Sequence, residues 1–136
     1  MSATRRSVRI ASREYNRAYA LDALHALGDA LYANLERLEQ ADAVKDGWIT
    51  AMMNEMIHKE DDIDGPIVGL LILTRRDLPP FSKEDRRTLI NLMTAADRCR
   101  GLTRTIRGGD HRPLEYLENI VCAMLGNVKR LINKIA

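Results

Sequence analysis

The chain has 136 residues, a length that favours one domain with a single hydrophobic core. Hydrophobic residues make up 46% of it and aromatic residues only 4%, which argues against a disordered chain and predicts a core of aliphatic side chains and methionine. The chain contains 21 lysines and arginines and 19 acidic residues. This near balance of charge argues against a purely electrostatic, histone-like nucleic-acid binder.

The chain begins with a basic segment over residues 1–11, which we predict to be a flexible arm. Ser12 is a candidate N-cap for a helix that continues to about Lys45, because Glu14 then lies near the positive end of the helix dipole. The same composition is typical of a mitochondrial transit peptide. We favour the arm, followed by a helical domain over residues 12–136. The arginines of the arm are Arg5, Arg6 and Arg9.

Leucine and alanine recur every three or four residues within the first predicted helix, so both sets lie on one broad side. In a heptad register the seam contains a single polar residue, Asn34. A lone asparagine in an apolar seam can fix the register or the oligomeric state of paired helices, unless Leu35 takes the buried position and leaves Asn34 half exposed. We therefore expect a docking surface and a homodimer. The predicted interface includes Leu24, Leu31, Asn34 and Leu38.

A second helix is predicted from Trp48 to Lys59, because its large apolar residues fall in pairs four positions apart. Asp46 and Gly47 separate it from the first helix, unless the two are continuous and Gly47 costs about 1 kcal/mol inside one long helix. Methionine-rich patches are deformable and are often used to bind partners. This segment therefore adds three residues to the predicted docking surface: Trp48, Met52 and Met56.

The apolar run Ile67–Leu73 has no periodicity that separates a buried strand from a buried helix. A lone strand would leave its backbone polar groups unpaired, because no other segment of the chain is a candidate strand. We therefore predict a short buried helix that begins near Pro66, after an acidic connector over residues 60–64.

Two more helices are predicted in the second half of the chain. Ser82 and Asp85 resemble a capping box, which opens a helix that ends near Gly101. A basic linker follows over residues 101–112, and Pro113 opens a last helix with a wide apolar face. The predicted fold is all-α, a single-domain bundle of four to five helices.

The acidic connector resembles the opening of an EF-hand calcium loop, with acids at Glu60, Asp62 and Asp64. The match fails at the twelfth position, where a bidentate glutamate is required and Leu71 is found. A zinc site needs three or four converging ligands, whereas the histidines are widely separated. We expect no metal and no cofactor. The histidines are His25, His58 and His111.

The sequence contains two cysteines, Cys99 and Cys122, which we expect to be buried free thiols in a reducing cytoplasm. Cys99 lies between Arg98 and Arg100, which would lower its pKa if they were close in space. Adjacent residues of a helix point to different sides, so this spacing does not predict a nucleophile. No catalytic residues are assigned.

Arginine is unevenly distributed and is well suited to phosphate groups and base edges. If the arm and the 98–112 segment lay on one face, they would form a positive stripe. This arrangement predicts nucleic-acid binding as an alternative function. Its residues are Arg5, Arg6, Arg9, Arg100, Arg104, Arg107 and Arg112.

The sequence therefore predicts a small non-enzymatic interaction protein, a regulator, adaptor or inhibitor that docks a helical surface onto a macromolecular partner. A protein partner is the first expectation and nucleic acid the alternative. No membrane partner is expected, because no apolar run approaches the roughly 20 residues that span a bilayer.

Overall fold

The computed structural model describes residues 2–43, 47–75 and 80–136, with side chains for residues 13–41, 48–74 and 80–136. Helices are the only regular elements in these ranges, so the all-α prediction is confirmed. There are five of them: α1 (Ser2–Ala43), α2 (Gly47–His58), α3 (Asp61–Arg75), α4 (Lys83–Arg107) and α5 (Leu114–Ile135).

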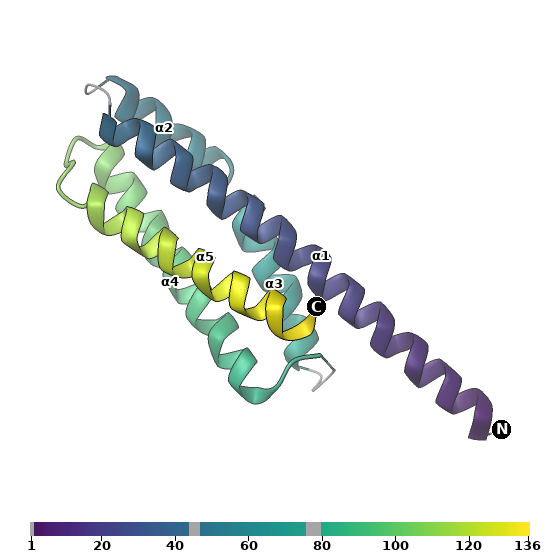
Figure 1. Ribbon diagram of the computed structural model, residues 1–136. Coiled ribbons are helices and arrows are strands. Elements are labelled where there is room, and N and C mark those ends of the chain that lie inside the picture. The colour runs from purple at the N-terminus through teal and green to yellow at the C-terminus, as the bar shows by residue number, and fades with distance from the viewer. Residues whose placement is uncertain (1, 44–46, 76–79) are drawn as a thin grey trace.

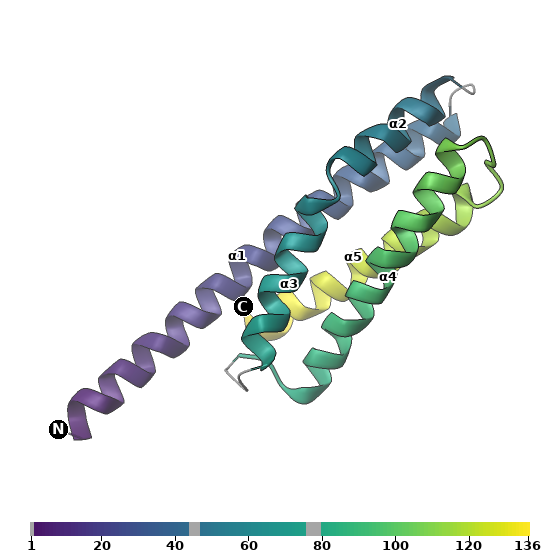
Figure 2. The ribbon, with the colours of Figure 1, turned by 180° about the vertical axis from the view of Figure 1, so that it is seen from behind.

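The five helices form an up-and-down bundle with four corners (Figures 1 and 2). α2 folds back along α1, and α3 continues in the direction of α2 after a two-residue turn at Lys59 and Glu60. Both α1 and α4 contact α2, α3 and α5, so α2 and α3 together occupy one corner. The first two helices are therefore separate, although residues 44–46 lie outside the described part of the chain.

The first helix begins at Ser2, ten residues before the predicted start at Ser12, so the backbone of the predicted arm is helical. Nothing interrupts a helix here, because the first glycine of the chain is Gly28 and no proline precedes it. Figure 1 shows the first turns of α1 running beyond the other four helices. The bundle begins at Arg17, whose Nε donates a hydrogen bond of 2.7 Å to the carbonyl oxygen of Ile135.

The leucine stripe of α1 lies at the centre of the bundle. Leu24, Leu27, Leu31 and Leu38 are all 0% exposed, and they pack against buried residues of α2, α3 and α5. Burial of each leucine side chain stabilises the fold by about 1.5–3 kcal/mol relative to exposure. The stripe is therefore the main apolar face around which the other helices assemble.

The apolar run Ile67–Leu73 is helical, as predicted, but its helix α3 starts earlier, at Asp61. The acidic residues expected to form a connector instead occupy its first turn, where they interact favourably with the helix dipole. Pro66 lies inside the helix, and its missing N–H costs one helical hydrogen bond. Complete burial of Ile67 and Leu70 compensates for that loss.

The predicted capping box at the start of α4 is confirmed. The backbone N–H of Asp85 donates to Ser82 Oγ at 3.2 Å, and the backbone N–H of Ser82 donates to Asp85 Oδ2 at 3.0 Å. The other carboxylate oxygen of Asp85 accepts a hydrogen bond of 2.7 Å from Lys134 Nζ. Asp85 thus connects the start of α4 to the last turn of α5.

The predicted end of α4 near Gly101 is wrong, because the helix continues to Arg107. Seven of the twelve residues of the expected 101–112 linker are therefore helical. Glycine inside a helix costs about 1 kcal/mol, and the burial of Thr103 and Ile106 on the following turns outweighs this cost. The connection to α5 is short, and Gly109 adopts a φ of +113°, a conformation that favours glycine.

We expect Leu31→Asp to unfold the protein, because the substitution places a carboxylate at a fully buried position. The neighbouring substitution Tyr32→Asp is the control, since Tyr32 is 55% exposed. Circular dichroism and thermal unfolding should show loss of helix for the first variant and little change for the second. A folded Leu31→Asp protein would contradict the central position of the stripe.

We expect Asp85→Asn to lower the free energy of unfolding by about 1–2 kcal/mol at neutral pH, because a buried cap and its ion pair are weakened. Burial raises the pKa of Asp85, but hydrogen bonds from Lys134 and Ser82 outweigh it and hold this pKa below its ordinary value of 3.8. The stabilisation is thus present above pH 4 and is lost as the pH falls through the lowered pKa.

Denaturant unfolding between pH 7 and pH 2 measures this effect. The difference between the wild type and Asp85→Asn should shrink at the acidic end of the range. Glu84→Gln serves as the matched control, because Glu84 lies in the same helical turn but is exposed. An equal effect for both substitutions, or a pH-independent difference, would argue against the role of Asp85.

Candidate functional site

Six of the seven residues predicted to form an apolar docking surface are buried within the chain. Leu24, Leu31 and Leu38 are 0% exposed, and the others are at most 6% exposed. These residues pack inside the bundle itself. The structure therefore corrects the prediction that they form a surface for a partner. The remaining buried members are Asn34, Met52 and Met56.

The lone polar residue of the seam, Asn34, has a role inside the chain. Its Oδ1 accepts a hydrogen bond of 2.7 Å from a terminal guanidinium nitrogen of Arg37. Arg37 Nε in turn pairs with Glu55 Oε2 at 3.1 Å. Asn34 therefore helps to align α1 with α2. Trp48 is the one residue of the predicted surface that remains accessible, with 57% of its area exposed.

Three of the predicted nucleic-acid-binding arginines are paired with acidic side chains. Arg100 contacts Asp64 and Asp97, and Arg104 binds both carboxylate oxygens of Glu60, at 2.6 and 3.1 Å. These hydrogen bonds raise the pKa of Arg104. Arg112 pairs with Asp110 in the same way, at 2.9 Å. Arg107 is exposed, and no ion pair to it is found in the described part of the chain.

The predicted positive stripe also fails for a geometric reason. The C-terminal end of α4 and the N-terminal segment of α1 lie at opposite ends of the molecule in both views (Figures 1 and 2). The arm and the 98–112 segment therefore cannot line one continuous face. Any nucleic-acid interface must use one end without the other.

The positive charge of the chain is concentrated in the part of α1 that projects from the bundle. Residues 1–16 contain four arginines and one acid, a net charge of +3, whereas residues 17–136 contain 17 basic and 18 acidic residues, a net charge of −1. Arg5, Arg9, Arg13 and Arg17 follow one another every four positions within a continuous helix. Residues at this spacing lie on the same side of a helix.

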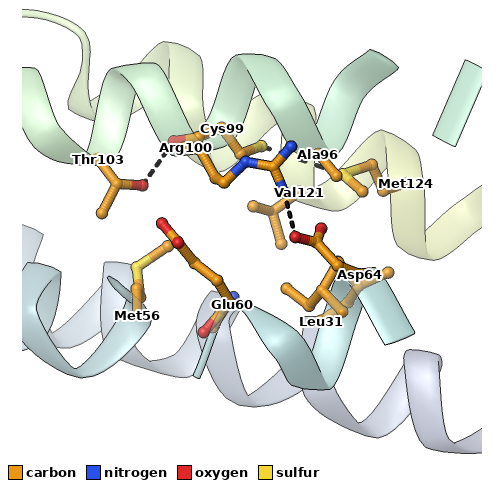
Figure 3. A pocket seen from close by; sticks show the side chains of 12 residues that line it. Leu31, Met56, Glu60, Asp64, Ala96, Cys99, Arg100, Thr103, Val121 and Met124 are labelled. Carbon is orange, nitrogen blue, oxygen red and sulfur yellow. Dashed lines mark hydrogen bonds and ion pairs between the residues drawn. The ribbon is translucent and has the colours of Figure 1, made fainter. Parts of the chain in front are cut away.

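A cavity of about 30 Å³ lies in the centre of the bundle, beside the turn between α2 and α3 (Figure 3). Glu60 and Asp64 lie on one side of it and Arg100 on the other, and Figure 3 shows Arg100 bonded to Asp64. This volume has room for about one water molecule, far below the 300 Å³ or more of a typical ligand pocket. The geometry fits a hydrated contact between helices and not a substrate site.

The thiol that lines this cavity is unsuited to nucleophilic attack at neutral pH. Burial raises the pKa of Cys99 to about 11, and the nearby charge of Arg98 lowers it by less. Cys99 Sγ lies 4.0 Å from Met124 Sδ. Cys122, by contrast, is exposed, so the prediction that both thiols are buried is wrong for this residue, and Cys99 is partly buried.

The residues weighed as metal ligands do not converge. His25 and His58 are exposed on different helices. Among the side chains that the structure describes, no group of three His, Cys, Asp or Glu residues could hold a metal ion. The described helices also include none that is both long and apolar enough to cross a membrane.

One accessible apolar surface was not predicted from the sequence. Val68 and Ile72 of α3 and Ile90 of α4 are 45%, 51% and 46% exposed. Together with Leu71 and Arg86 they line an open hollow of about 310 Å³, which we call the α3–α4 face. The sequence signal for it is that α3 is apolar on more than one side, so the bundle leaves some of its apolar residues uncovered.

No family model, no curated protein and no solved structure matches this chain. The two exposed features described above, the projecting segment of α1 and the α3–α4 face, therefore provide the basis for a functional hypothesis.

We expect the two cysteines to differ strongly in reactivity in the folded protein. A pKa near 11 leaves Cys99 about 90-fold less ionised at pH 8 than an ordinary thiol with a pKa near 9. Alkylation by iodoacetamide, followed by mass spectrometry, should modify Cys122 first and Cys99 only slowly. Cys99→Ser and Cys122→Ser identify each product. Similar rates for both thiols at pH 8 would contradict the burial of Cys99.

Proposed function

We propose that this protein is a small non-enzymatic interaction protein, a regulator, adaptor or inhibitor that docks a helical surface onto a macromolecular partner. The observation that carries the proposal is the basic helical segment at the start of α1, which projects from a bundle of opposite net charge. Because the apolar stripe is buried, we now favour nucleic acid as the partner over a protein bound through that stripe.

The dimensions of the projecting segment suit a duplex. Residues 2–16 form about 22 Å of helix at 1.5 Å per residue. An α-helix with its side chains is about 10–12 Å wide, and the major groove of B-form DNA is about 12 Å wide. Arginine can bind phosphates and base edges with two parallel hydrogen bonds. A helix with arginine at every fourth position can therefore contact the duplex along its length.

A nucleic acid fits the segment better than a lipid surface does. A helix that lies on a membrane needs large apolar side chains opposite its basic face. In the helical register of α1, the positions opposite the arginines carry small or polar residues, Thr4, Ser7, Ala11 and Ala18, and a single large aromatic residue, Tyr15. We further propose a cytoplasmic location, where the two free thiols remain reduced.

The test is the salt dependence of binding to a duplex DNA oligonucleotide of mixed sequence, measured by fluorescence anisotropy. Four phosphate contacts, one for each arginine of the projecting segment, give a log–log slope of about −3.6, so affinity should fall about 150-fold between 50 and 200 mM salt. The triple substitution Arg5→Gln, Arg9→Gln and Arg13→Gln should reduce the slope to about −1.

The matched control neutralises three exposed cations of the bundle, Arg87, Arg107 and Lys129, by substitution with glutamine. It removes the same charge and should leave the slope close to that of the wild type. The proposal fails if the wild type does not bind at low salt, or if the two triple variants have the same slope.

A further inference from the structure

We infer that a second copy of this chain covers the α3–α4 face, with the two α4 helices antiparallel and Ile90 close to the two-fold axis. The inference concerns a surface separate from the projecting segment of α1 and does not rest on the proposed nucleic-acid function. α1 and α5 pack against each other on the other side of the bundle from the contact between α3 and α4.

The exposed aliphatic side chains of the α3–α4 face would be stabilised by contact with another apolar surface. Val68 and Ile72 lie one helical turn apart on α3, and Ile90 lies across the hollow on α4. About half of each side chain is exposed, although aliphatic residues of this size are usually buried. Within the described ranges, the hollow is lined by residues of α3 and α4 alone. The three residues therefore form one contiguous patch, unlike the exposed tyrosines, which are spread over α1 and α5.

The charges on α4 determine which partner fits this patch. Lys83 lies seven residues before Ile90 and Asp97 seven residues after it, so all three lie along one line of the helix, with the two charges each about 10 Å from Ile90. In an antiparallel pair centred on Ile90, Lys83 of each copy faces Asp97 of the other. A two-fold contact needs a patch that is complementary to itself, and this arrangement meets that requirement.

The remaining pairs in this alignment bring no like charges together. Arg86 faces Thr94 of the second copy, and Arg87 faces Met93. Lys83 and Arg86 are both exposed, and Asp97 has 57% of its side chain exposed although it also contacts Arg100. The carboxylate of Asp97 is therefore accessible to Lys83 of a second copy while it also contacts Arg100. An unrelated partner would need an acid opposite Lys83 and a base opposite Asp97 at the same spacing. A second copy of the chain already has both charges at these positions.

The test measures the mass of the full-length protein by sedimentation over a wide concentration range. The wild type should form a dimer, and the single substitutions Lys83→Glu and Asp97→Lys should each weaken it about tenfold, because each creates two like-charge contacts per dimer. The double variant Lys83→Glu, Asp97→Lys exchanges the charges and should restore the affinity. Arg107→Glu, at the far end of α4, is the control and should have no effect.

A second set of variants tests the apolar centre. Ile72→Glu and Ile90→Glu should give monomers that keep their helical circular dichroism, because both residues are half exposed in the monomer. Tyr32→Glu, at an exposed position of α1, should leave the dimer intact. A wild type that is monomeric at all concentrations, a double variant as weak as its parents, or a dimer that survives Ile90→Glu would overturn the inference.

Discussion

The burial of the α1 leucine stripe is the constraint on which the rest of the structure depends. The stripe extends from Leu24 to Leu38, and four of its five leucines are fully buried, whereas Leu35 is partly buried. One helix cannot cover so broad a face, so α2 and α3 pack along one side of α1 and α5 along the other. Because the chain satisfies this requirement internally, its contacts with other molecules must come from what the bundle leaves exposed.

The break between α2 and α3 accounts for much of the charge pattern. The turn at Lys59 and Glu60 allows two short helices to follow the length of α1. It also brings Glu60 and Asp64 to the side of α4, where they pair with Arg104 and Arg100. Arg100 and Arg104, which belong to a basic cluster in the sequence, therefore link α4 to α3 and to the turn before it. The net positive charge that remains is found in the first 17 residues.

Local patterns predicted the fold well, and the candidate site poorly. The capping box at Ser82 and Asp85 and the apolar faces of α1 and α5 depend on residues a few positions apart, so sequence spacing reveals them. Periodicity shows that a face is apolar but not which molecule covers it, which is why the stripe was assigned to a partner. The pairs that neutralise Arg100 and Arg104 join residues 36 and 44 positions apart and depend on tertiary packing. Gly101 remains helical for the same reason, since the burial of Ile106 compensates for its cost.

The separation of charge along the molecule links the two proposed surfaces. The bundle from Arg17 onward carries a net charge of −1 and the projecting segment one of +3, so the proposed polyanion would be drawn to the N-terminal end of α1. The proposed contact between copies uses a different surface, the apolar α3–α4 face, although α3 itself packs against α1. Apolar burial changes little with salt, whereas phosphate contacts weaken steeply. Salt should therefore separate the two proposed associations, releasing the polyanion while the contact between copies, which also includes the Lys83–Asp97 pairs, weakens less.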